Sequence, residues 1–121
     1  MQEPQYSAVN LEEKLALFAD HWSPRIVGRM NGHEVMVVKG KGAFPWHHHD
    51  DTDDFFLVLS GVLRIETEHG DVTLHPGEFF VIPRGVRHRP VAEEEVSLML
   101  IEPAGTPNTG DAATAAEKVW I

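Results

Sequence analysis

Turn signals recur at short intervals along most of this chain, and they leave room only for short elements between them. Apolar runs rich in β-branched and aromatic residues fill these intervals, for example FFLVL at 55–59 and LMLI at 98–101. Many short strands at regular spacing are typical of a β-sandwich or β-barrel. The turn signals are Asn31-Gly32, Ser60-Gly61, His69-Gly70, Pro76-Gly77 and Pro83-Arg84-Gly85.

We expect one short helix before the strands begin. Leu11, Leu15 and Phe18 recur at helical spacing, and Asn10 is placed to cap a helix over 11–19. No pattern of alternating strands and helices follows, which argues against a parallel α/β sheet. The expected strands are 26–30, 34–39, 43–49, 55–59, 62–68, 72–74, 79–82, 86–91 and 96–102.

The segments 55–59 and 98–101 are apolar on both faces. A strand with one face in water should alternate apolar and polar residues, so another element must cover their outer faces. The edge of another sheet, the N-terminal helix or a second subunit would each do this. Of these we expect a symmetric homodimer.

Composition narrows the classes of function. A formal net charge of −9 argues against a nucleic-acid partner. The sequence contains no cysteine, which excludes thiolate metal sites and fits a reducing compartment. Neither a membrane-spanning apolar run nor a signal peptide is visible, the latter judged from residues 1–10, so we expect a cytoplasmic protein without a membrane partner.

A histidine run carries the chemical signal. His47 and His49 are two residues apart, so on a strand both side chains point to one face and His48 to the other. Asp54 lies at an odd spacing from them, which on a continuous strand would put it on the opposite face. The turn-like residues 50–52 would restart the phase and could return Asp54 to the His47 side.

A second stretch supplies a third histidine. The Pro83–Gly85 turn precedes His88, and alternation would turn Arg87 and Arg89 away from the face that His88 occupies. Three imidazoles and a carboxylate could bind one divalent transition metal, which could be Fe, Mn, Ni, Zn or Co. They would leave coordination positions on that metal open for other ligands. The alternative is an exposed histidine loop with no role. The remaining histidines have no such pattern and are expected at the surface: His21, His33, His69 and His75.

These residues resemble the two motifs of the cupin superfamily, of the small conserved-barrel type that includes mannose-6-phosphate isomerase-like proteins. The match departs from the pattern at Lys41 (usually Gly), at Asp54 (usually Glu) and at Ala92 (usually Asn). The matching positions of the first motif are His47, His49, Asp54 and Gly61, and those of the second are Gly77, Pro83, Gly85 and His88.

The resemblance implies an all-β fold, a double-stranded β-helix or jelly-roll barrel, with the short helix at its N-terminus. Residues 1–121 would form a single cupin domain, with the barrel core at about 24–103 and a loosely ordered tail at 104–121. It further implies metal ligation by His47, His49 and His88. Asp54 would bind directly or act through water or a histidine, and Asp53 is a weaker substitute.

The resemblance implies a metal-dependent enzyme acting on a small oxygenated metabolite, of the isomerase, epimerase or dioxygenase type, with Asp54 as a general base when it is free of the metal. Alternatives are a non-catalytic metal or small-ligand sensor, and a structural dimer without metal. Strand parity points Phe56, Val58, Val86 and Pro90 inward, so the pocket should be mainly apolar. Rim arginines could bind anions or, as we prefer, balance nearby acids: Arg84, Arg87 and Arg89.

Overall fold

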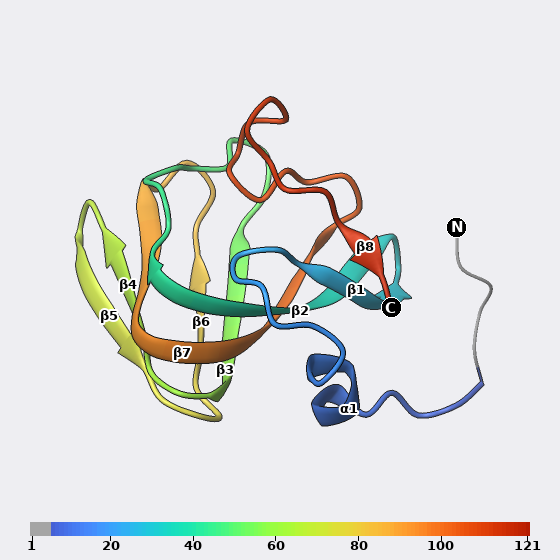
Figure 1. The fold of residues 1–121 in the computed structure, drawn as a ribbon. Coiled ribbons are helices and arrows are strands. Elements are labelled where there is room, and N and C mark those ends of the chain that lie inside the picture. Colours follow the sequence, from blue (N-terminus) through green and yellow to red (C-terminus); the bar gives the residue numbers. More distant parts are fainter. Residues whose placement is uncertain (1–5) are drawn as a thin grey trace.

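The computed structural model describes residues 6–121, and its two longest strands are paired antiparallel to each other (Figure 1). They are β2 (His33–Ala43) and β7 (His88–Pro103). The first part of β7 pairs with β4 and its last part with β3, so the β2–β7 pair belongs to two sheets at once. The other elements are α1 (Leu11–Leu15), β1 (Arg25–Met30), β3 (Asp54–Ser60), β4 (Leu63–Thr67), β5 (Gly70–Leu74), β6 (Phe79–Ile82) and β8 (Val119–Trp120).

One sheet continues from β7 through β4 to β5, and the other from β7 through β3 to β6. On the far side of β2, β1 pairs antiparallel and β8 adds a short parallel edge. The shared strands bend where the register of β2 shifts between Gly40 and Gly42. A bulge of this kind increases the local twist and lets one strand pass from one sheet into the next.

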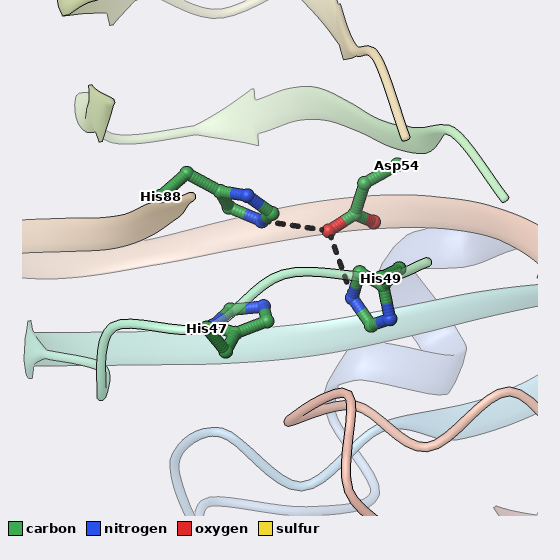
Figure 2. Close-up of side chains that lie close together, drawn as sticks. All are labelled: His47, His49, Asp54 and His88. Carbon is green, nitrogen blue, oxygen red and sulfur yellow. Dashed lines mark hydrogen bonds and ion pairs between the residues drawn. The ribbon is translucent and has the colours of Figure 1, made fainter. Parts of the chain in front are cut away.

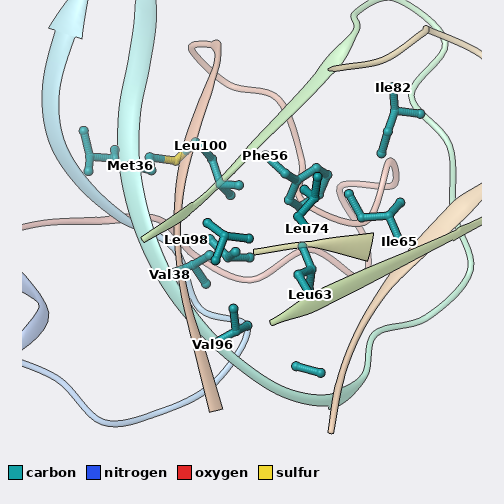
Figure 3. Close-up of a cluster of buried hydrophobic side chains, with 13 residues drawn as sticks. Met36, Val38, Phe56, Leu63, Ile65, Leu74, Ile82, Val96, Leu98 and Leu100 are labelled. Carbon is teal, nitrogen blue, oxygen red and sulfur yellow. The ribbon is translucent and has the colours of Figure 1, made fainter. Parts of the chain in front are cut away.

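The core lies between the two sheets (Figure 3). Phe56 and Val58 of β3 point inward, as their parity predicted, and Val86 packs against the same cluster from outside the strands. The largest side chains that are fully shielded from solvent come from both sheets: Met36, Leu63, Ile65, Ile82 and Leu98. Burial of this apolar surface is the main force that closes the barrel.

The predicted all-β fold with one short helix is confirmed, but two strand predictions are wrong. The segment 43–49 is not a strand: β2 ends at Ala43, and a single antiparallel bridge follows at His47. Pro45 has no N–H to donate, so it interrupts the ladder there. The segments expected at 86–91 and 96–102 form one strand, because β7 runs through the three exposed glutamates that separate them.

The helix begins where predicted and ends earlier. The Asn10 side chain accepts a hydrogen bond from the Glu13 N–H at 3.0 Å, which confirms the cap. The helix stops at Leu15 rather than at residue 19. The chain then turns so that the Phe18 ring lies under two cations of the barrel, Arg25 at 4.5 Å and Lys39 at 5.1 Å.

The C-terminal tail passes over the end of the barrel where the 43–54 loop lies, and it ends in β8 (Figure 1). Trp120, near the end of this tail, packs against the core cluster. Within residues 6–121 no helix is long and apolar enough to span a membrane. The first half of the segment in which we expect no signal peptide, residues 1–5, lies outside the described residues.

Candidate metal centre

Two hairpins are joined at His47 and His88. Each residue donates its backbone N–H to the carbonyl of the other, both at 2.9 Å. Paired in this way, the two side chains project to the same side, and their ring centroids lie 4.4 Å apart. His49 follows on that side, with its ring 5.1 Å from that of His47, while His48 stays exposed. The same-face prediction for His47 and His49 is thus confirmed.

Asp54 starts β3 and points at these imidazoles (Figure 2). Its Oδ2 lies 3.0 Å from His88 Nε2 and 3.3 Å from His49 Nε2. The irregular segment 50–53 resets the strand phase, as the turn-like residues suggested. All four side chains are buried, and one donor atom from each lies within 4.8 Å of the others.

The donor set fits a transition metal. The Nδ1 atoms of His47 and His88 lie 2.9 Å from the carbonyls of Pro45 and Val86, so each Nδ1 donates its proton there. This fixes the tautomer of His47 and leaves its Nε2 lone pair free for an ion. His88 Nε2 instead donates to Asp54 Oδ2, and a bound ion would replace that proton. With metal–ligand bonds of about 2.1 Å, two ligands of one ion lie up to about 4.2 Å apart. Small rotations would bring the four atoms within that reach. Together they form a possible site for one divalent metal.

The protonation states of the four side chains also favour a bound cation. Burial lowers the pKa of His47 to about 4, so its imidazole is neutral at neutral pH. Burial alone would raise the pKa of Asp54, but hydrogen bonds from His49 and His88 outweigh it and lower the pKa to about 2. Burial also opposes protonation of His49, yet its bond to Asp54 raises the pKa of that imidazole. A permanent carboxylate beside imidazoles attracts a cation.

A pocket opens onto three of the four side chains, those of His47, His49 and Asp54, and among the described residues His88 is not part of its lining. Its empty volume is about 400 Å³, part of it open to solvent. Most of its lining is apolar, which agrees with the predicted pocket character, and Phe56 and Pro90 face it as expected. The lining residues are Trp22, Pro24, Val38, Phe44, His47, His49, Asp54, Phe56, Pro90, Leu100, Glu102 and Asn108.

The other sequence candidates lie elsewhere. Asp53, the substitute for Asp54, is exposed and accepts a hydrogen bond from the Arg84 N–H instead. Arg84 and Arg89 pair with acidic side chains, and Arg87 lies over the Trp46 ring, so none of the three faces the pocket. The preferred reading as charge balance is confirmed for Arg84 and Arg89. The four remaining histidines are at the surface, as expected: His21, His33, His69 and His75.

Sequence reasoning missed the three residues of the pocket wall outside the metal centre whose side chains can form hydrogen bonds: Trp22, Glu102 and Asn108. Glu102 lies near the end of an apolar strand, two residues after Leu100 and four after Leu98. The strand alternation that points these two leucines inward therefore also predicts an inward position for Glu102. Trp22 and Asn108 lie in segments without periodicity, and no sequence signal places them.

Comparison with known proteins identifies the class. Residues 33–102 match the sequence profile of the cupin domain, and the chain therefore belongs to the cupin superfamily. The crystal structure of a cupin-2 domain-containing protein from Shewanella frigidimarina superposes with a TM-score of 0.77 at 46% identity, covering 78% of this chain and 93% of that one. The predicted family and fold are thus confirmed.

Two relatives of known sequence are similar to this chain, and one of them is an enzyme. The Uncharacterized protein YdbB of Bacillus subtilis is 32% identical over 90 residues, 74% of each chain. A 3-hydroxyanthranilate 3,4-dioxygenase of Ruegeria pomeroyi is 32% identical over 83 residues, which is 64% of this chain and 46% of the enzyme. This chain therefore matches about half the length of that dioxygenase.

Proposed function

We propose that this protein is a metal-dependent dioxygenase that acts on a small hydroxylated aromatic molecule, with the metal held by His47, His49, Asp54 and His88. The observation that carries the proposal is the convergence of three imidazoles and a carboxylate beside a mainly apolar pocket, with His47, His49 and Asp54 on its wall. Similarity to 3-hydroxyanthranilate 3,4-dioxygenase supports the reaction class. An iron ion would supply a binding position for the substrate oxygen and the redox chemistry that dioxygen needs.

The pocket lining favours an aromatic over a sugar phosphate, the substrate that the isomerase alternative would require. A phosphate is normally held by arginine, lysine or backbone N–H groups. Among residues 6–121, none of those that line this pocket is Lys or Arg. Rings of Trp22, Phe44 and Phe56 instead form much of the wall, and aromatic side chains suit a flat ring placed among them.

Each residue of the centre has a task in this proposal. The Pro45 and Val86 carbonyls orient the rings of His47 and His88. Asp54 supplies the negative charge that would hold the cation, because the low pKa of its carboxyl, about 2, keeps it ionised. The apolar wall excludes water from the reacting ring. Ring opening with both oxygen atoms retained converts one substrate and one O₂ into one product, so no external reductant is required.

Oxygen uptake tests the proposal. Protein without a tag is loaded anaerobically with Fe²⁺, Mn²⁺, Ni²⁺, Co²⁺ or Zn²⁺, and then given catechol, hydroquinone, 2-aminophenol or 3-hydroxyanthranilate in aerated buffer. We expect one O₂ consumed per ring-opened product with one of the redox-active metals, and none with Zn²⁺. The matched controls are His49→Ala, expected to be inactive, and His48→Ala, expected to be active. Absence of turnover with every metal and substrate, with the substrates bound unchanged, would instead favour a binding module.

We also propose that the protein is a homodimer through the outer face of β3, β6 and β7. On β3 the apolar side chains that do not enter the core are Phe55, Leu57 and Leu59. Phe55 and Leu57 pair across to Ile101 and Met99 of β7. Phe79 is 61% exposed and stacks on Phe55 with ring centroids 5.4 Å apart. An apolar sheet face of this kind, with no charge among these positions, fits an identical face of a second copy.

Light scattering after size exclusion tests the dimer. The expected mass is twice that of the 13.5 kDa chain. Phe79→Lys should yield a folded monomer, because it places a charge on the apolar face at its most exposed phenylalanine. A wild-type monomer at micromolar concentration would contradict the proposal. A cytoplasmic location is our further proposal, supported by the absence of cysteine.

A further inference from the structure

Glu102 is a buried carboxylate on the pocket wall with only part of its hydrogen-bonding capacity used. Its exposure is 4%, and it faces the same cavity as His47, His49 and Asp54. Oε1 accepts a hydrogen bond from Lys118 Nζ at 2.9 Å. Within residues 6–121, Oε2 takes part in no hydrogen bond. Among the described residues Oε2 is also not one of the fully shielded atoms without a partner, so it remains able to accept a hydrogen bond from a molecule in the pocket.

The other polar groups of the wall outside the metal centre are already engaged. The indole N–H of Trp22 donates to the Lys41 carbonyl at 3.0 Å. The Asn108 amide donates to the Trp22 carbonyl at 3.4 Å and accepts from the Ala116 N–H at 2.9 Å. The Glu102 Oε2 atom is therefore the acceptor that this wall leaves for a molecule in the pocket.

Lys118 fixes the position of Glu102 from the C-terminal tail. Its ammonium group is mostly buried, lies 3.7 Å from Glu34 Oε1, and also donates to the Thr106 carbonyl. Glu34 and Glu102 are register partners on β2 and β7, so one lysine bridges two neighbouring carboxylates beneath the tail. A bridged carboxylate loses rotational freedom, which is what a recognition group needs.

We infer that Glu102 determines specificity by accepting a hydrogen bond from a hydroxyl or amino group of the ligand, with Lys118 as its positioning residue. This inference rests on the proposed function and narrows it. The ligand binds the metal through one oxygen and carries a second donor group on its ring. A ring with a methyl ether at that second position would leave Oε2 unpaired and would bind less well.

Binding of matched phenols to the Zn²⁺-loaded protein tests this without turnover. The probes are resorcinol and hydroquinone, each against its monomethyl ether (3-methoxyphenol and 4-methoxyphenol), measured by calorimetry. In neither diol can the second hydroxyl reach the metal that binds the first. For at least one pair we expect wild-type protein to prefer the diol by about tenfold or more, the scale of a hydrogen bond to a charged group.

Three variants should reduce that preference. The double variant Glu102→Leu/Lys118→Met removes both charges, so neither is left unpaired. We expect its preference for the diol over the monomethyl ether to fall to about twofold or less. Glu102→Gln keeps the size of the side chain and should lower the preference at least about threefold, which covers the case that the double variant fails to fold. Lys118→Met should lower it without changing the metal content.

Two matched controls separate positioning from general loss of structure. Glu117→Gln removes an exposed tail carboxylate, and Lys14→Met removes another tether of the tail, its bond to the Ile121 carbonyl. Both should keep the wild-type preference. An unchanged preference in the Glu102 variants, with all probes still bound, would overturn the inference alone. If no probe binds the metal-loaded protein, the proposed function fails and this inference fails with it.

Discussion

The backbone atoms of His47 and His88 are hydrogen-bonded to each other in both directions, at 2.9 Å each. Two histidines from motifs that lie far apart in the chain are therefore held at a fixed spacing by main-chain atoms. Their side chains contribute nothing to that bridge, so a substitution at either position can remove a donor while the two hairpins stay joined. The centre is in this sense assembled by the fold before any ion arrives.

Single substitutions should separate ligands from neighbours in the histidine run. We expect His47→Ala and His49→Ala to lower bound metal at least tenfold, since loss even of a residue that only orients a ligand typically costs 10–100-fold in affinity. His48→Ala is the matched control, because this neighbour is exposed and pairs with Asp50. The measurement is elemental analysis of untagged protein. Equal metal content in all three variants would remove the basis for the centre.

Removing the metal should lower thermal stability. An ion that binds only the folded barrel stabilises it by about 2.7 kcal/mol when its free concentration is 100 times the Kd. In a chain of this size that corresponds to a shift in Tm on the order of 10 °C. Differential scanning calorimetry before and after chelation measures it, and readdition of metal should restore the original Tm. The same Tm in both states would mean that folding and metal binding are not linked.

Alternation along strands explains why so much of the site could be predicted from sequence. His47 and His49 share a face even though the strand expected at 43–49 does not exist, because extended backbone alternates with or without a ladder. Asp54 was harder, since its face depends on how residues 50–53 turn. That turn is decided by tertiary contacts, including the bond between the Arg84 N–H and Asp53.

The pocket wall shows where sequence reasoning ends. Glu102 and Lys118 meet because the tail folds back over the barrel, and a tail of small polar residues has no periodicity from which such a contact follows. The short strand β8 also depends on the path of the tail, because its two residues pair with β1 only where the tail returns to the barrel. The contacts of the Phe18 ring with Arg25 and Lys39, after α1 has ended at Leu15, also join segments that no local pattern connects.

Acid should weaken the metal-free protein through Asp54. Its pKa in the folded state is about 2, against an ordinary value of 3.8, because His49 and His88 hold the ionised form against the effect of burial. The stability from this group is fully present above about pH 4 and is lost as the pH falls toward 2.

The amount is on the order of 2 kcal/mol. Urea unfolding of wild-type and Asp54→Asn protein from pH 5 to pH 2 measures it, with Asp53→Asn as an exposed control. The Asp54→Asn variant should lack this part of the pH dependence, so the two stability curves converge at low pH. Parallel curves over the whole range would show that Asp54 is not held in its ionised form by the imidazoles.

A methyl group at Gly40 should disturb both the fold and the pocket. A Cβ at this position would overlap the ring of Trp22, and that ring lines the cavity beside the metal centre. Gly40→Ala should therefore destabilise the protein by about 1–3 kcal/mol, the usual cost of overpacking, and should weaken the binding of resorcinol as the ring is displaced. Gly28→Ala is the matched control, since it also lies in a strand and a Cβ there meets nothing within 4 Å. Urea unfolding and calorimetry measure the two effects. If Gly40→Ala behaves like Gly28→Ala in both, Trp22 is free to move and does not define the pocket wall.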